Sequence, residues 1–349
     1  MSKPPKTRKG SRSFSVSAHG LPKSNHSRRV PISQAKAPAG VSADRRAIPA
    51  DAQESLWIAP DGHRVRRIDL PQDEPRGSIL FLGGRGDFFE KYLEALVHWQ
   101  SRGWRVTAAD WRGQAGSGRL GVDAVTGHIE DFAVWVADLA ALWAQWSAET
   151  PGPHVLAGHS MGAHLALRAT AERAVQPDGL VLVAPMLGLA GRLPTGVTHA
   201  LARVMVALGD ARRPAWKWSE KPGEPPASRE HLLTHDPARY ADELYWRQQR
   251  PDLVMGPGSW GWVERASASM RSLLRPGVLE AVAVPTLMLA AREDKLVAFR
   301  AVADAAARLP NVELVTFGPE ARHEILRESD AVRTRAMTSI DAFLDRISG

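Results

Sequence analysis

The feature that most constrains the fold of this chain is the alternation of short apolar runs with longer helical patterns. Short runs suited to β-strands lie at residues 55–59, 64–70, 78–82, 105–109, 154–157, 179–184, 285–290 and 312–316. Stretches with helical spacing of apolar residues lie at 88–101, 129–148, 161–172, 297–308 and 331–346. Strands that alternate with helices of about 10–20 residues form mostly parallel sheets covered on both faces. The sequence therefore predicts an α/β fold on a mostly parallel, eight-stranded sheet.

One long segment, residues 187–276, breaks this alternation. It is rich in Trp and Pro and separates the strand expected at 179–184 from the strand expected at 285–290. Insertions this long between two sheet strands are usually functional, and ligands of open α/β sheets bind beyond the carboxyl ends of the strands. We therefore expect residues 187–276 to form a helical cap over a binding site.

Residues 1–47 differ in composition from the rest of the chain. The whole chain has 45 Lys and Arg against 38 Asp and Glu, a formal charge of +7, but residues 1–46 hold eleven of the bases and only one acid. The remainder, with 34 basic and 37 acidic residues, is mildly acidic. This distribution does not favour nucleic-acid binding by the body of the protein. The Ser- and Pro-rich start predicts a basic, disordered tail at 1–47, followed by a catalytic domain at 48–347.

The tail has two open interpretations. It is either an unstructured extension without a role or a polybasic segment that contacts anionic lipid. No apolar core of a secretory signal follows the basic start, and no run reaches the roughly 18–20 apolar residues that span a bilayer. The chain also has no cysteine, which excludes disulfides, thiolate metal sites and a cysteine nucleophile. We expect a cytoplasmic protein, with peripheral contact at the inner face of the membrane if the tail binds lipid.

The segment Gly158-His159-Ser160-Met161-Gly162 lies directly between an apolar run and a helical pattern. The pattern G-x-S-x-G is common by itself, but a strand–turn–helix context is typical of a nucleophile on a tight turn. Such a turn exposes the serine hydroxyl and directs the helix N-terminus at developing negative charge. We therefore predict that Ser160 is a nucleophile; a structural serine in a Gly-rich turn is the alternative.

A serine nucleophile needs a base and an acid that orients the base. On this arrangement of elements the acid and then the histidine follow the serine along the chain. Asp294 comes just after the apolar run 285–290, and His323 comes just after the run 312–316. We predict that His323 takes the proton of Ser160 and that Asp294 orients the imidazole. Glu293 is the alternative acid.

Backbone N–H groups near Ser160 would stabilise the oxyanion of the reaction. We expect one donor at Met161, directly after the nucleophile, and a second at Arg85 in the Gly-rich loop that follows the run 78–82. The loop does not carry either common phosphate-cradling motif, so we do not expect a nucleotide site. His159 and His164, beside the nucleophile, are expected to pack or to position other groups.

Several short motifs, in order, resemble the lysophospholipase L2 and monoacylglycerol lipase branch of the α/β-hydrolases, whose domain is also called serine aminopeptidase S33. They are Gly84-Arg85, Glu90-Lys91-Tyr92, Asp110-Trp111-Arg112-Gly113-Gln114, Gly127-His128-Ile129, the Ser160 pentapeptide, Ala184-Pro185-Met186 and Arg322-His323-Glu324. The resemblance covers about residues 48–347. Two positions depart from the usual pattern: Gly83 stands where a histidine is common, and Ala115 where a glycine is common.

This resemblance implies the α/β-hydrolase fold, with helices on both faces of the sheet and a cap insertion. It implies the triad Ser160, Asp294 and His323, the oxyanion donors Arg85 and Met161, and no metal or organic cofactor. The implied substrate is a small lipid ester, a lysophospholipid or a monoacylglycerol, cleaved through an acyl-enzyme. The alternatives are another carboxylesterase or small-peptide aminopeptidase of this fold and, less favoured, a non-catalytic binding protein.

Overall fold

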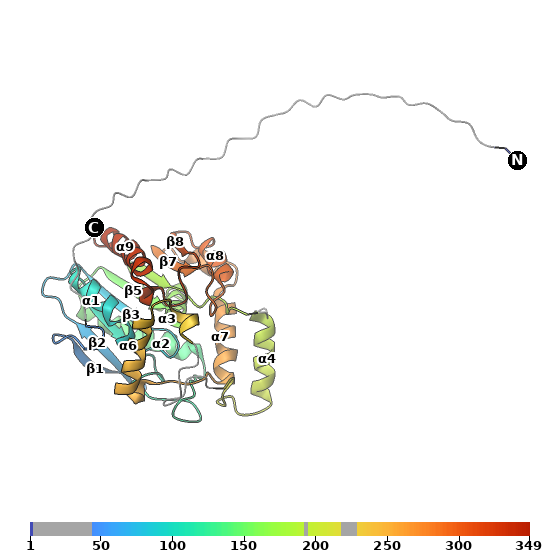
Figure 1. Cartoon of the computed structure of the whole chain (residues 1–349), viewed down its shortest axis with the longest axis horizontal. Coiled ribbons are helices and arrows are strands. Elements are labelled where there is room, and N and C mark those ends of the chain that lie inside the picture. The colour runs from blue at the N-terminus through green and yellow to red at the C-terminus, as the bar shows by residue number, and fades with distance from the viewer. Residues whose placement is uncertain (3–43, 192–194, 218–228) are drawn as a thin grey trace. The chain divides into compact units, whose positions relative to one another are not determined.

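A computed structural model describes residues 1–2, 44–191, 195–217 and 229–349 (Figure 1). Most of the tail that the sequence predicts to be disordered, residues 3–43, lies outside the described residues. Two residues that precede the predicted domain boundary at residue 47 contact the folded domain. The Nε atoms of Arg45 and Arg46 lie 2.5 and 2.6 Å from the two carboxylate oxygens of Asp242.

One sheet of eight strands forms the centre of the described chain, in the spatial order β1-β2-β4-β3-β5-β6-β7-β8. The strands from β4 to β8 in this order pair in parallel, whereas β2 pairs antiparallel with both β1 and β4. This confirms the predicted mostly parallel, eight-stranded sheet. The strands are β1 Gln53–Ile58, β2 Arg64–Leu70, β3 Ser78–Leu82, β4 Arg105–Ala109, β5 His154–His159, β6 Gly179–Val183, β7 Thr286–Ala291 and β8 Val312–Phe317.

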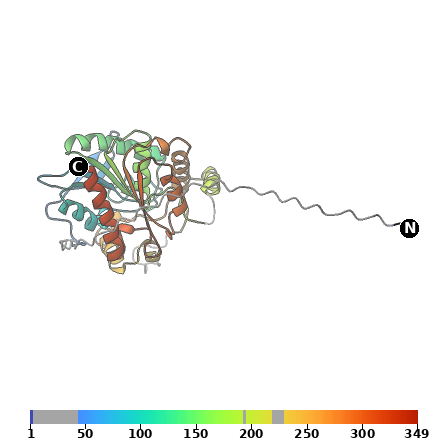
Figure 2. The same cartoon turned by 90° about the horizontal axis from the view of Figure 1, so that it is seen from above.

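Helices cover both faces of the sheet (Figure 2). Side chains alternate between the two faces of a strand, so Leu80 and Leu82 of β3 belong to one apolar core while Ile79 and Phe81 belong to the other. Because both faces are buried, the central strands are continuous apolar runs in the sequence. The first core also holds α2 Phe132–Glu149, α3 Met161–Ala171 and α8 Phe299–Ala306; the second holds α1 Leu93–Ser101 and α9 Asp330–Ile347.

The segment between β6 and β7 contains further helices, of which α4 and α7 lie side by side (Figure 1). Polar side chains begin two of them: Asp236 accepts a hydrogen bond from the Arg239 amide at the start of α6, and Ser259 accepts one from the Trp262 amide at the start of α7. These helices are α4 Thr195–Ala207, α5 Glu230–Leu233, α6 Pro237–Gln249 and α7 Trp260–Leu273. Short 3-10 helices lie at η1 Phe89–Tyr92, η2 Pro251–Leu253, η3 Leu279–Ala281 and η4 Ile325–Arg327.

No helix in the described ranges combines the length and the apolar content that crossing a bilayer requires.

Candidate active site

Ser160 occupies the sharp turn between β5 and α3. Its backbone has φ 52° and ψ −113°, a combination that is unfavourable for a residue with a side chain. Three backbone hydrogen bonds hold this conformation. The Ser160 amide donates to Val183 O at 2.9 Å, and the Ser160 carbonyl accepts from the amides of His164 and Met186, both at 3.0 Å. The turn is therefore fixed by β6 and by the segment that follows it.

The two glycines that flank Ser160 are required by the close approach of α3 to the sheet. A Cβ atom on Gly162 would lie 2.2 Å from Leu82 O and 2.4 Å from Gly83 O. A Cβ atom on Gly158 would lie 2.6 Å from Ala163 N. Because each of these neighbours is backbone, it cannot rotate away as a side chain could. The G-x-S-x-G pattern thus has a packing reason in this chain.

The structure brings together the three residues that the sequence predicts as a triad. His323 Nε2 lies 2.9 Å from Ser160 Oγ, and His323 Nδ1 lies 2.7 Å from Asp294 Oδ2. When Nδ1–H donates to the carboxylate, Nε2 is left as an acceptor for the serine proton. The side chains of His323 and Asp294 are only 5% and 3% exposed, so water competes little with these bonds.

Asp294 is held as an ionised acceptor. Its Oδ1 accepts hydrogen bonds from the backbone amides of Leu296 at 2.7 Å and Val297 at 3.0 Å. Burial favours the neutral acid, but the adjacent His323 and the hydrogen bonds outweigh burial and lower the pKa of Asp294 below its ordinary value. Glu293, the alternative acid, is exposed on the outside of this turn. The contacts therefore favour Asp294.

The loop after β3 is fixed on both sides of Arg85. The Gly84 amide donates to Asp87 Oδ2 and the Gly86 amide donates to the Gln114 side-chain oxygen, each at 2.7 Å. Gly84 also packs against the nucleophile, because a Cβ atom placed on it would lie 3.0 Å from Ser160 Cβ. The Arg85 amide is thus placed next to the serine.

Met161 is the first residue of α3, where a backbone N–H has no acceptor within the helix. No described residue accepts a hydrogen bond from the amide of Met161 or from that of Arg85. Backbone amides beside the serine that have no acceptor among the described residues suit an oxyanion site. Their use in catalysis stays a prediction.

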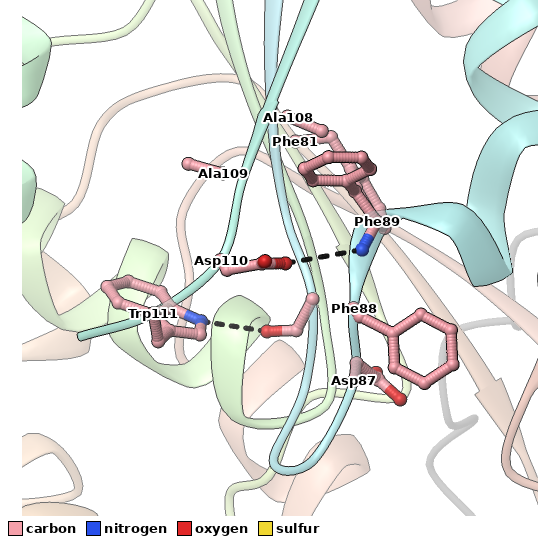
Figure 3. Close-up of a pocket in the computed structure, with 9 residues that line it drawn as sticks. Phe81, Asp87, Phe88, Phe89, Ala108, Ala109, Asp110 and Trp111 are labelled. Carbon is pink, nitrogen blue, oxygen red and sulfur yellow. Dashed lines mark hydrogen bonds between the residues drawn. The ribbon is translucent and has the colours of Figure 1, made fainter. Parts of the chain in front are cut away.

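Figure 3 shows the contacts that hold the base of this loop. The Trp111 indole nitrogen donates to Gly83 O at 2.8 Å, and Asp110 Oδ1 accepts from the Phe89 amide at 3.3 Å. The cavity between these residues has a volume of only about 10 Å³, which is near the minimum for one water molecule. These side chains therefore support the loop and do not line a substrate site.

A buried cluster of charged residues behind His323 was not predicted from the sequence. Lys91 Nζ lies 2.6 Å from Asp87, 2.7 Å from Glu324 and 3.1 Å from Glu243. Arg327 bonds the two glutamates as well. Burial raises the pKa of Glu324, but Arg327 and Lys91 outweigh this effect and lower it to about 2. The sequence signal that could have indicated this cluster was a run of charged residues within helical turns that are otherwise buried.

This cluster contacts the site through Asp87 and His159. Asp87 Oδ2 accepts from Tyr92 Oη at 2.7 Å and lies 3.0 Å from His159 Nδ1. His159 Nε2 is 3.3 Å from the backbone carbonyl of His323. His159 therefore connects the loop that carries Arg85 to the segment that carries His323, and its positioning role stays a prediction.

Ser160, the predicted nucleophile, opens onto a cavity of about 720 Å³. Ser160 and His323 lie in its wall, and residues of the insertion between β6 and β7 supply much of the rest. The larger apolar side chains among its described lining residues are Met186, Leu189, Leu201, Trp216, Leu232, Leu233, Met255, Trp260, Trp262 and Leu296. A volume of this size falls within the usual range for ligand sites, and its walls suit an apolar chain.

Fold and site together are those of an α/β-hydrolase. Residues 73–330 match the family described as serine aminopeptidase, S33. Lysophospholipase L2 of Escherichia coli is 31% identical over 315 residues, which cover 84% of this chain and 87% of that protein. The probable lysophospholipase L2 of Haemophilus influenzae is 25% identical over 286 residues, covering 80% of this chain and 87% of that protein.

Solved structures show the same fold. A soluble variant of monoglyceride lipase from Saccharomyces cerevisiae superposes with a TM-score of 0.68 at 17% identity, covering 85% of this chain and 95% of that chain. The chain belongs to the serine aminopeptidase S33 family of α/β-hydrolases and is an ester hydrolase of its lysophospholipase-like branch. The family, the fold and the enzyme class predicted from the sequence are confirmed.

Proposed function

We propose that the protein hydrolyses the ester bond of a single-chain glycerolipid, a lysophospholipid or a monoacylglycerol, with Ser160 as nucleophile. The observation that carries this proposal is the 2.9 Å contact between Ser160 Oγ and His323 Nε2 at the wall of an apolar cavity of about 720 Å³. The names of the similar proteins, lysophospholipase L2 and monoglyceride lipase, support the same substrate class.

The proposed reaction follows from the contacts of the triad. His323 Nε2 accepts the Ser160 proton while Oγ bonds to the ester carbonyl carbon. The carbonyl oxygen becomes an oxyanion and accepts hydrogen bonds from the amides of Arg85 and Met161. The tetrahedral intermediate then collapses, the carbon–oxygen bond to glycerol breaks, and His323 gives its proton to the departing alcohol. Water repeats these steps on the acyl-enzyme and releases the fatty acid.

The charges around the cavity favour a lipid ester over a peptide with a free amino terminus. An aminopeptidase needs an anionic group to bind the substrate ammonium ion. Asp87 and Glu324 are the carboxylates among the described lining residues, and both already lie within 2.7 Å of Lys91 Nζ. Most of the remaining wall is apolar, so an acyl chain is the better fit.

Labelling with a fluorophosphonate tests the nucleophile. We expect the wild-type protein to be labelled and Ser160→Ala to be neither labelled nor active, with a loss of hydrolysis of about 10³-fold or more. Ser339→Ala is the matched control, because that half-buried serine lies on α9 and its hydroxyl donates to Arg335 O of the same helix. Labelling that persists in Ser160→Ala would contradict the proposal. Rates on lysophospholipids, monoacylglycerols, short-chain p-nitrophenyl esters and aminoacyl amides then separate the possible substrates.

We also infer a cytoplasmic protein that contacts the inner face of the membrane through its basic start. Residues 1–43 contain nine Lys and Arg and no Asp or Glu, a composition that is attracted to anionic lipid. Exposed apolar side chains on and just after α4, Val197, Leu201, Val204 and Leu208, also suit contact with lipid.

A chain that starts at Asp44 tests the membrane contact. This start keeps Arg45 and Arg46, which bind Asp242 and so belong to the folded domain. Sedimentation with vesicles containing phosphatidylserine is expected to fall for the shortened chain, while hydrolysis of a p-nitrophenyl ester is unchanged. Equal binding by the full and shortened chains would show that the basic start is not the contact.

A further inference from the structure

Contacts with neighbouring residues hold the side chain of Arg85 in a fixed position in the wall of the cavity. Its guanidinium carbon lies 5.0 Å from the ring centroid of Trp216 and 5.2 Å from that of Trp262. Its Nη2 donates to Gly256 O at 2.7 Å. Cation–π contacts and one backbone acceptor fix the group without neutralising its charge.

Two glycines make room for this arginine. A Cβ atom on Gly127 would lie 3.2 Å from Arg85 Nη2, and a Cβ atom on Gly258 would lie 3.2 Å from Arg85 Nε. Gly127 and Gly258 also form a parallel β-bridge with one another. The backbone of two distant segments is thus closed around the guanidinium, which indicates a fixed orientation.

Arg85 has no acidic partner among the described residues, and its Nε is shielded from solvent without a hydrogen-bond acceptor. In this respect Arg85 differs from the four arginines that are buried in the described part of the chain. Each of those pairs with at least one carboxylate: Arg66 with Glu90, Arg112 with Asp138, Arg239 with Glu94 and Arg327 with Glu243. An uncompensated charge in such a place is costly unless a ligand supplies the counter-charge.

The surroundings strengthen the positive potential. Burial and the nearby charge of Arg229 lower the pKa of Arg85 from its ordinary value to about 9, so the group is still a cation at neutral pH. Lys295 also lines the cavity, whereas the lining carboxylates Asp87 and Glu324 are bound to Lys91. A ligand that enters this part of the cavity therefore meets the cations of Arg85 and Lys295, while both carboxylates among the described lining residues are already bound.

Arg85 carries its positive charge close to the place where the substrate ester would react. The backbone amide of Arg85 lies next to Ser160, where the ester carbonyl reacts, and the side chain extends from the same residue into the cavity wall. In a lysophospholipid the phosphate is attached to the same glycerol as the scissile ester, only a few bonds from the carbonyl. A cation near the oxyanion site is thus placed to meet a phosphate on the leaving alcohol.

We propose that the Arg85 guanidinium binds the phosphate of the substrate and selects lysophospholipids over monoacylglycerols. This inference rests on the proposed function and narrows its substrate class. A guanidinium binds phosphate through parallel N–H bonds, and hydrogen bonds between charged groups are the stronger kind. A monoacylglycerol, which has a hydroxyl in place of the phosphate, leaves the cation of Arg85 without a counter-charge.

The test compares two oleoyl lipids that differ in the phosphate, lysophosphatidylglycerol and monooleoylglycerol, in the same neutral detergent micelles. The measured quantity is the ratio of kcat/KM for the first lipid to kcat/KM for the second. Arg85→Met keeps the backbone N–H, so any effect on the oxyanion site is common to both lipids and cancels in the ratio. We expect this ratio to fall about tenfold or more in Arg85→Met. Arg85→Lys keeps the charge but not the planar guanidinium, so the ratio should fall less in this variant.

Arg335→Met is the matched control, because it removes one exposed cation on α9 and is expected to leave both rates unchanged. Fluorophosphonate labelling and thermal unfolding verify the fold of each variant, and Arg85→Lys remains informative if Arg85→Met does not fold. A ratio within twofold of the wild type in both Arg85 variants, or a wild-type preference for monooleoylglycerol, overturns the inference alone. Hydrolysis of neither lipid by wild-type protein that is still labelled at Ser160 overturns the proposed substrate class as well.

Discussion

At the scale of single residues, the contacts around His323 explain why one of two adjacent acids would serve the reaction. Asp294 and Glu293 follow β7 in succession, but the chain turns between them so that Asp294 points to the histidine and Glu293 is exposed. Two backbone amides bond the other oxygen of Asp294. A carboxylate that is fixed in this way can hold Nδ1 of His323 protonated and leave Nε2 free for the serine.

Replacing Asp294 by Asn tests this assignment. An amide in that position can donate to Nδ1 and thereby favour the wrong tautomer of His323, so kcat is expected to fall about 10³- to 10⁴-fold. Glu293→Gln makes the same chemical change one residue earlier and should alter kcat less than twofold. Steady-state kinetics on a p-nitrophenyl ester near pH 7 measure both. An equal loss in the two variants would remove the distinction between the acids.

At the scale of elements, the position of the nucleophile depends on how closely α3 approaches β3. The carbonyl oxygens of Leu82 and Gly83, at the end of β3, occupy the space that a side chain on Gly162 would need. The loop that follows β3 carries the Arg85 amide. A displacement of α3 would therefore move Ser160 and Met161 away from Arg85, the predicted second oxyanion donor.

Gly162→Ala is expected to lower the free energy of unfolding by about 2 kcal/mol or more, because the new methyl group would overlap backbone atoms that cannot rotate away. It should also lower kcat by shifting the turn. Gly196→Ala in α4 is the matched control, since nothing lies within 4 Å of a Cβ atom there. Chemical denaturation and ester hydrolysis measure the two effects. A stable, fully active Gly162→Ala protein would be incompatible with the packing described.

At the scale of the whole molecule, the buried charged cluster connects parts of the chain that are far apart. Lys91 and Glu324 are separated by 233 positions in the sequence, and Lys91 Nζ lies 2.7 Å from Glu324 Oε1. Glu243 of α6 joins them, so the insertion between β6 and β7 is tied to the loops that carry the candidate catalytic residues. Breaking one buried ion pair leaves an uncompensated charge, which costs about 3–5 kcal/mol.

The cluster makes a prediction about pH. The pKa of Glu324 is lowered from 4.5 to about 2 in the folded protein, so its stabilising contribution is present above about pH 4.5 and is lost as the pH falls toward 2. Glu324→Gln should therefore lower the free energy of unfolding by about 3 kcal/mol at pH 7, and the difference from wild type should shrink below pH 4.5. Urea denaturation from pH 3 to pH 7 measures it, with exposed Glu149→Gln as the control. A difference that is constant over this range would exclude ionised Glu324 as its source.

Much of the fold and of the candidate site could be predicted because local patterns carry the information. Each strand in the centre of the sheet is a buried apolar run, and Ser160, Asp294 and His323 each come just after such a run. The carboxyl ends of parallel strands meet at one edge of the sheet, so the order of these residues along the chain implies their proximity. The sequence also left two neighbouring acids as candidates, because alternation does not specify the direction of a side chain within a turn.

The sequence by itself determined the class of fold, the G-x-S-x-G turn between a strand and a helix, and the order of the predicted triad. Only the tertiary structure placed Asp294 rather than Glu293 against His323, brought Lys91 to Glu324, and closed Gly127 and Gly258 around the guanidinium of Arg85, which has no acidic partner in the described part of the chain. The physical reason is the separation along the chain of the residues that interact. Periodicity and turn motifs report the neighbours of a residue along the chain, whereas the charge that a buried side chain meets depends on segments that only folding brings together.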